Sequence, residues 1–205
     1  MAFKMKTPAT HILGAFASGL KDCPHLDDEY TPNSSYHVPA YAVTLKDLVS
    51  LGAGQSIDNV AREVAWQCLA VSKSGGVAVG EVTPRTKASR PAGRVFDGPV
   101  KMSSLSYGPI ITGAYKTVMG LAAFADDLTQ KYQVRGDYEP RMLRIPGVLV
   151  TAVWLKSQSA DETDWVVPLH TKISALKPEI PVTMEKFLEA VLPVARARLA
   201  SPVFD

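Results

Sequence analysis

The sequence predicts an α+β fold: one compact domain with an antiparallel sheet, about four packed helices and long irregular loops. Stretches with apolar residues three and four positions apart, typical of helices, occur beside stretches of branched residues that alternate as in strands. The two kinds do not alternate regularly along the chain, which disfavours a doubly wound parallel sheet. A length of 205 residues suits one large domain, so we expect residues 1–205 to share one core.

The composition is that of an ordinary globular protein. Apolar residues make up 46% of the chain and charged residues 20%, which excludes a disordered chain, a coiled coil and a fibrous repeat. The net charge of +2 gives no protein-wide attraction to nucleic acid. Apolar runs stay well below the roughly 18 residues of a membrane span. The N-terminal segment lacks the apolar core of a signal peptide, so we expect a cytoplasmic protein without membrane association.

The first elements are an irregular segment and two helices. Residues 22–41 contain three prolines and no periodic pattern, which is typical of a long irregular segment. Thr44 and Asp47 resemble a capping box at the start of a short helix, and Gly52 is its stop. Ser56 caps a second, amphipathic helix. Apolar residues recur along it at helical spacing: Ile57, Val60, Ala61, Val64, Cys68 and Leu69.

A strand and a long basic loop follow. Val77, Val79 and Val82 alternate as in a strand, with Gly80 as a weak point or bulge. Residues 83–101 hold three prolines, one acidic and five basic side chains, a pattern that suits neither a helix nor a central strand. We therefore expect an exposed loop. Its basic residues are Arg85, Lys87, Arg90, Arg94 and Lys101.

The second half of the chain begins with the helix that we expect at the centre of the core. Apolar residues at helical spacing run through residues 109–132, and Gly136 ends the pattern. Residues 141–156 and 164–171 are rich in branched side chains and are joined by a polar turn, as in an antiparallel pair of strands.

Two prolines mark the end of the fold. Pro168 predicts that the second of these strands lies at a sheet edge, because proline cannot donate to a neighbouring strand. Thr183 caps a last helix, and Pro193 inside it must kink or end that helix.

Three residues form a weak set of metal ligands: Cys23, His25 and His37. A thiolate and imidazoles are zinc ligands, but this spacing matches no zinc pattern, so we expect no metal and no cofactor. Tyr36 and His37 lie among prolines and other tyrosines, which together offer an adaptable contact surface. The competing interpretation is that these rings attach the segment to the body of the protein.

An enzymatic alternative is a small hydrolase or transferase with a cysteine nucleophile and a histidine base. The pair is Cys23 or Cys68 with His170, which ends a predicted strand. Cys68 lies in an apolar stretch, as a core residue does, and neither cysteine lies in a known nucleophile motif. The sequence therefore favours a protein that is not an enzyme.

The leading hypothesis is a protein-binding module whose contact surfaces are residues 22–41 and the basic loop 83–101. Its partner is another protein or a second copy of the chain, since an edge strand offers unpaired backbone groups. The second alternative is binding of nucleic acid or another anion through the side chains of the basic loop, namely Arg85, Lys87, Arg90 and Arg94.

Overall fold

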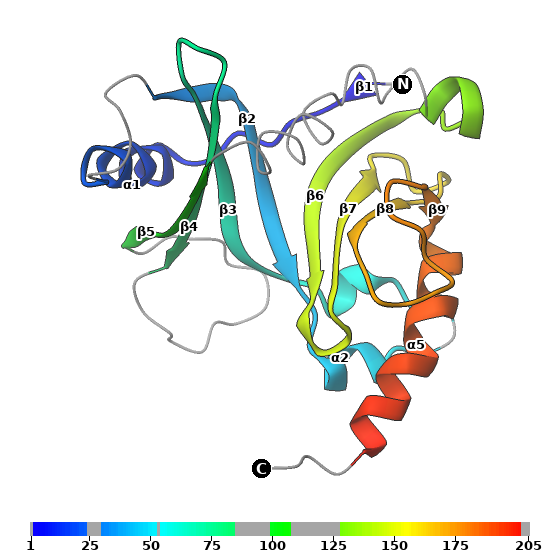
Figure 1. Cartoon of the computed structure of the whole chain (residues 1–205). Coiled ribbons are helices and arrows are strands. Elements are labelled where there is room, and N and C mark those ends of the chain that lie inside the picture. Colours follow the sequence, from blue (N-terminus) through cyan, green and yellow to red (C-terminus); the bar gives the residue numbers. More distant parts are fainter. Residues whose placement is uncertain (1, 24–29, 53, 85–98, 108–127, 202–205) are drawn as a thin grey trace. The chain divides into compact units, whose positions relative to one another are not determined.

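The computed structural model describes residues 2–23, 30–52, 54–84, 99–107 and 128–201 (Figure 1). They fall into two compact units. Unit 1 is formed by Met1–Ala2, Ala40–Glu63 and Val134–Asp205, and unit 2 by Phe3–Pro39 and Val64–Gln133. The expectation of one domain for residues 1–205 stays a prediction.

Strands dominate the described part of the chain. Nine strands lie within the described ranges; their hydrogen-bonded neighbours follow the order β5-β4-β3-β2-β6-β7-β8-β9, and β1 pairs with β6. Their bounds are β1 Ala2–Phe3, β2 Thr31–Ala42, β3 Arg62–Val71, β4 Val77–Pro84, β5 Val100–Tyr107, β6 Asp137–Ile145, β7 Val150–Ser157, β8 Trp165–His170 and β9 Val182–Thr183. Most pairs are antiparallel, but β2 and β6 run parallel. The predicted α+β class is therefore compatible with the structure, and its antiparallel sheet is confirmed only in part.

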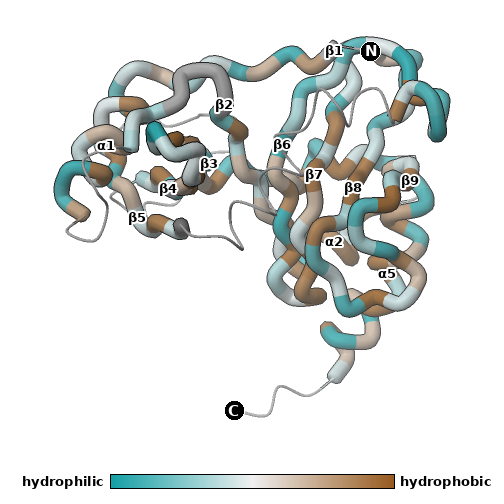
Figure 2. Tube along the Cα trace, turned by 45° about the horizontal axis from the view of Figure 1, so that its top comes forward, coloured by the Kyte–Doolittle hydropathy of each residue, from teal (hydrophilic) through white to brown (hydrophobic). Residues whose placement is uncertain are grey.

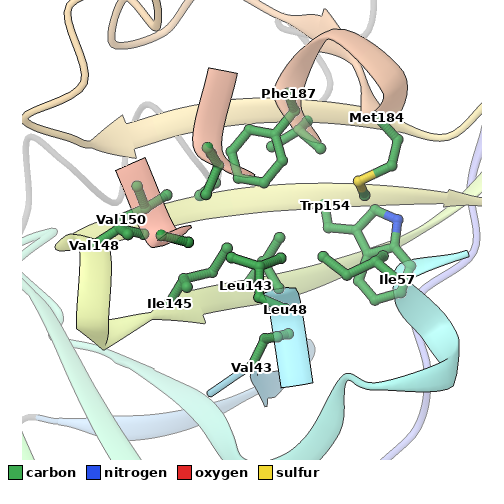
Figure 3. Packing of buried hydrophobic residues seen from close by; sticks show 14 of the residues in the cluster. Val43, Leu48, Ile57, Leu143, Ile145, Val148, Val150, Trp154, Met184 and Phe187 are labelled. Carbon is green, nitrogen blue, oxygen red and sulfur yellow. The ribbon is translucent and has the colours of Figure 1, made fainter. Parts of the chain in front are cut away.

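In unit 1, two helices pack on the sheet. They are α2 (Leu45–Val49) and α5 (Met184–Ala200). Hydrophobic and hydrophilic residues alternate along α5 and the strands near it (Figure 2), as expected for elements with one buried side. Figure 3 shows Met184 and Phe187 of α5 facing Trp154, with Leu48 of α2 and Leu143 in the same cluster.

Both helices of unit 1 begin where the sequence predicts. The side chain of Thr44 accepts a hydrogen bond from the amide of Asp47, and that of Thr183 accepts one from Lys186. Pro193 does not end α5, which continues to Ala200. Its ring lies on the exposed side of the helix, where water can bind the carbonyl that has lost its amide partner.

In unit 2, helix α1 (Thr10–Lys21) packs on β4 and β5. Ile12, Phe16 and Leu20 lie one turn apart and form its buried side. They join a core cluster of strand residues: Trp66, Cys68, Ala70, Ala78, Val82 and Val100.

The predicted helix after Ser56 is wrong beyond its first turn. Ser56 caps only the short 3₁₀ turn η1 (Ile57–Asn59), and residues 62–71 form β3. β3 pairs with β2 on one edge and with β4 on the other. Both of its faces are also covered, so residues that point to either side are buried: Ala65, Trp66, Cys68, Leu69 and Ala70. When a strand is buried on both faces, nearly all of its residues are apolar, and the spacing of apolar residues cannot distinguish a strand from a helix.

The predicted irregular segment 22–41 is also corrected, because β2 occupies its second half. Ala40 and Tyr41 pair with Met142 and Leu143 of β6. Proline can adopt an extended backbone but has no amide hydrogen to donate. Frequent prolines therefore argue against a strand in the local sequence, although the backbone here is extended. Residues 24–29, which include His25, lie outside the described residues.

The strand predicted over 141–156 is a hairpin instead. β6 and β7 are separated by the turn η2 (Pro146–Val148) and by Leu149, whose left-handed φ of 56° reverses the chain. The predicted antiparallel pairing of residues 141–156 with 164–171 is confirmed as the pairing of β7 with β8. The edge position predicted from Pro168 is wrong, because Trp165 and Val166 of β8 also pair with β9.

Two other predicted elements fall mainly outside the described residues. They are residues 85–98 of the basic loop and residues 108–127 of the central helix. Lys101 of the loop belongs to β5, and the last residues of the helix, 128–132, are helical. No helix in the described ranges is long and apolar enough to cross a membrane.

Gly80 of β4 is required by packing. A Cβ atom at this position would overlap the ring of Phe16, which is fully buried where α1 crosses the sheet. The bulge expected at Gly80 lies instead one residue later, between Glu81 and Val82 in the pairing of β4 with β5.

We predict that Gly80→Ala lowers the free energy of unfolding by about 1–3 kcal/mol, the usual cost of overpacking a core. Urea unfolding followed by circular dichroism measures it. Gly14→Ala is the matched control, because Gly14 is in the same helix as Phe16 and has no atom within 4 Å of an added Cβ. Gly14→Ala should raise stability by up to about 1 kcal/mol, and an equal loss in both variants would contradict the packing argument.

Candidate functional site

A cavity lies in unit 2 between the end of α1 and the start of β5. Its volume is 320 Å³, the size of a site for a single side chain or a small ligand. The residues that line it are Ala15, Ser18, Gly19, Asp22, Cys23, Val100, Lys101 and Met102.

The close approach of α1 to β5 forms this cavity. A Cβ atom on Gly19 would come within 2.7 Å of the Met102 side chain, so the helix can reach the strand only because this residue has no side chain. The amide of Asp22 donates to the carbonyl oxygen of Ser18 at 3.1 Å, and the amide of Cys23 to that of Leu20 at 3.3 Å. These bonds close the helix and hold Cys23 at the cavity.

The β5 side of the cavity is the end of the strand order. Within the described residues, β5 pairs with β4 and has no neighbour on its other edge. Glu81 pairs with Ser104 and Val82 with Met102, so Ser103 is the extra residue of a bulge. The Ser103 hydroxyl donates to the carbonyl oxygen of Glu81 at 3.1 Å.

The bulge decides which side chains of β5 face the core. Val100 and Met102 are buried or half-buried before it, and Leu105 packs against the same cluster after it. Lys101 is exposed and is the only cationic side chain among the cavity residues, while Asp22 is the only anionic one. The site thus offers an open strand edge, a cavity and one charge of each sign.

The cysteine and histidine candidates lie in different places. Cys23 lines the cavity and is half-buried, whereas Cys68 is fully buried in the core of unit 2. Burial raises the pKa of the Cys68 thiol to about 12, which makes it a poor nucleophile. His170, the last residue of β8, is exposed and belongs to unit 1.

Of the three candidate metal ligands, only Cys23 and His37 lie in the described part of the chain. His25 lies outside the described residues, and His37 is buried in β2 with 2% of its surface exposed. Over the described ranges, His, Cys, Asp and Glu side chains form no group of three that could hold a metal ion. Neither ring nitrogen of His37 has a hydrogen-bond partner there.

The predicted binding residues are largely outside the described part. Arg85, Lys87, Arg90 and Arg94 all fall in residues 85–98, and nothing is described of the Tyr36 side chain. His37 faces the interior, so it contributes no exposed contact surface.

Sequence reasoning missed a charged cluster in unit 1. The Arg141 guanidinium lies 4.9 Å from the ring centre of Tyr41 and 4.8 Å from that of Trp154. It donates to Glu139 at 2.8 Å and to Asp58 of η1 at 2.9 Å. Burial lowers the pKa of Arg141, but these hydrogen bonds and charges outweigh it and raise the pKa overall.

Lys156 extends this cluster. Its ammonium group lies 2.7 Å from an oxygen of Asp58 and 3.2 Å from one of Asp164. Asp164 also accepts from the indole nitrogen of Trp154 at 2.9 Å. Each charge here already has an opposite partner, so the cluster holds η1 against β6 and β7. It became visible only with the strand register that pairs Glu139 with Lys156.

The comparisons with known proteins add no identity. No protein-family model, curated protein or solved structure matches this chain. The function can therefore be inferred only from the residues and geometry of the chain itself.

We predict that iodoacetamide at pH 8 modifies one thiol per folded chain, because a buried thiol with a raised pKa does not react. Mass spectrometry should locate the label on Cys23 and leave Cys68 unmodified. In urea both cysteines should react, and Cys23→Ser should abolish labelling of the folded protein. Rapid labelling of Cys68 in the folded protein would contradict its placement in the core.

We predict that the buried His37 makes the folded protein less stable in mild acid. Burial lowers its pKa from the ordinary value of 6.5, so the unfolded chain binds a proton at pH values where the folded chain does not. Stability contributed by the neutral ring is present above pH 6.5 and falls as the pH drops toward the folded pKa.

The variant His37→Leu should remove this contribution. Its free energy of unfolding should depend less steeply on pH than that of the wild type, by at most about 1.4 kcal/mol per pH unit. Urea unfolding at pH values between about 5 and 8 gives both slopes. Identical slopes would show that His37 is protonated in the folded protein as easily as in the unfolded one.

Proposed function

We propose that this protein is a binding module that holds an extended segment of a partner protein along β5. The observation that carries the proposal is the edge of β5 beside the cavity at α1, which no other strand of the described residues covers. A strand edge offers backbone donors and acceptors in a row, and an added strand satisfies them while a neighbouring pocket selects a side chain.

The bulge limits where the added segment binds. Bulges twist an edge strand and discourage pairing along its whole length. At Ser103 the bulge divides β5 in two, and only Val100–Met102 borders the cavity. We therefore assign the partner segment to this half of the strand, with one of its side chains in the cavity.

Charge favours a partner segment with an acidic residue. Lys101 is exposed at the cavity, and an ammonium group there attracts a carboxylate. In the sequence, the stretch before β5 holds one acidic residue, Asp97, and four basic ones: Arg85, Lys87, Arg90 and Arg94. Charges of this kind increase the rate of encounter with an acidic partner even when they make no direct contact.

The two alternatives have less support. The residues that line the cavity give Cys23 no histidine that could act as its base. Binding of nucleic acid is supported by the basic residues of the sequence alone, since residues 85–98 lie outside the described residues.

A random peptide library displayed on phage tests the proposal, with the full-length protein as bait. We expect selected peptides to be enriched in acidic residues and to protect the amides of residues 100–102 from hydrogen exchange when they bind. Lys101→Glu should weaken binding by about tenfold or more, as reversal of a close charge does.

Lys73→Glu is the matched control. Lys73 is an exposed lysine in the turn between β3 and β4, a turn that adjoins the other end of β5, near Tyr107. This variant changes the net charge equally and should keep its affinity. Peptides that leave β5 unprotected, or an equal loss in both variants, would overturn the proposal.

A further inference from the structure

Helix α5 of unit 1 has an exposed end that the rest of the unit leaves largely uncovered in the described residues. Its first half is anchored in the core by Met184, Phe187 and Val191, but residues 196–200 are all exposed. Leu199 exposes 43% of its surface. An isolated apolar residue on a surface is common, so the pattern around Leu199 decides whether it has meaning.

Leu199 continues a row of leucines along one flank of the helix. Leu188 and Leu192 are only partly buried against the core, and the spacing of the three is four and seven residues. Buried Ala195 lies between the last two. The spacing of four and seven residues puts the three leucines on one side of the helix, the leucine seam, while Ala195 itself packs in the core of unit 1.

Two exposed charges of opposite sign flank this seam. Glu189 and Arg196 are seven residues apart, so they lie on the same side of the helix, two turns from each other. In the part of the chain that the structure describes, neither forms an ion pair. If a second copy of the helix lies antiparallel to the first, Glu189 of each copy lies opposite Arg196 of the other.

We propose that a second copy of this chain docks on α5, with the two helices antiparallel around a twofold axis near Leu192. In this arrangement Glu189 faces Arg196 of the second copy, and Arg196 faces its Glu189, so two ion pairs form by symmetry. Leu199 then reaches Leu188 of the second copy. A parallel arrangement puts the charged flanks of the two copies on opposite sides of the interface, so Glu189 and Arg196 cannot meet and neither ion pair forms.

This interface explains two features of α5. The helix continues past Pro193, whose ring is on the exposed side and away from the leucine seam, so it does not obstruct a neighbouring helix. Arg198, on the opposite flank, donates to the carbonyl oxygen of Gly147 at 2.8 Å and holds the projecting end to the β6–β7 turn. The exposed end is thereby fixed in one direction before any partner binds.

Charge reversal tests the proposal by sedimentation equilibrium of the full-length protein over a wide concentration range. We expect a concentration-dependent dimer. Arg196→Glu and Glu189→Arg should each weaken dimerisation by about tenfold or more, because each places two like charges in contact twice. The double variant exchanges the charges and should restore dimerisation to within about threefold of the wild type.

Lys186→Glu is the matched control. It makes the same change in net charge as Arg196→Glu on the same helix, but it lies about 120° from the leucine seam and should leave the dimer unchanged. Leu199→Ser removes apolar contact without altering charge and should also weaken the dimer. All these residues are exposed, so circular dichroism should show every variant folded.

A wild type that stays monomeric at about 100 μM would overturn the proposal. Single reversals without effect, or a double variant that fails to recover, would overturn it as well. The inference goes beyond the peptide site of unit 2, and Lys101→Glu should leave the dimer intact, so the two proposals fail independently.

Discussion

The contact between the Phe16 ring and the backbone of Gly80 determines how unit 2 is built. It lets α1 lie directly on β4, and the neighbouring approach of Gly19 to Met102 brings the end of the same helix to β5. Both approaches depend on a missing side chain, one on the strand and one on the helix. Because close-packed interiors tolerate little extra volume, these two glycines fix the helix within narrow limits. The cavity lined by Cys23 and Lys101 is a consequence of that placement.

Unit 1 uses charge where unit 2 uses close packing. The hydrophobic cluster under α5 ends at Trp154, and beyond it the same face of the hairpin carries Arg141, Glu139 and Lys156. Stacking between two aromatic rings and ion pairs to carboxylates offset the cost of burying a guanidinium. Asp58 forms ion pairs with both Arg141 and Lys156. These ion pairs hold the short turn η1, in which Ile57 is the buried residue. Each charge of the cluster has an opposite partner within it, so the cluster joins η1 to the β6–β7 hairpin.

The two proposed surfaces suit a protein whose function is association. Among the described residues, β5 has one edge without a neighbouring strand, and the end of α5 has no element that covers it. Neither contains a group of side chains arranged for acid–base or nucleophilic chemistry among the described residues. The thiol of Cys68 is enclosed, and that of Cys23 lies beside a lysine and an aspartate. Surfaces of this kind recognise a partner by backbone hydrogen bonds, apolar contact and charge.

Features that depend on near neighbours in the chain could be predicted from the sequence alone. The caps at Thr44 and Thr183, the strand over Val77–Val82 and the pairing of β7 with β8 follow from hydrogen bonds and periodicity within a few residues. The strands β2 and β3, in contrast, depend on contacts that form only when the chain folds. β2 is stabilised partly by pairing with β6, about 100 residues later, and β3 is covered on both faces, so local periodicity carries no trace of either. The site has the same origin: Cys23 and Lys101 were both visible as residues, but only the approach of α1 to β5 placed them at one cavity, because long-range packing is not encoded in any local pattern.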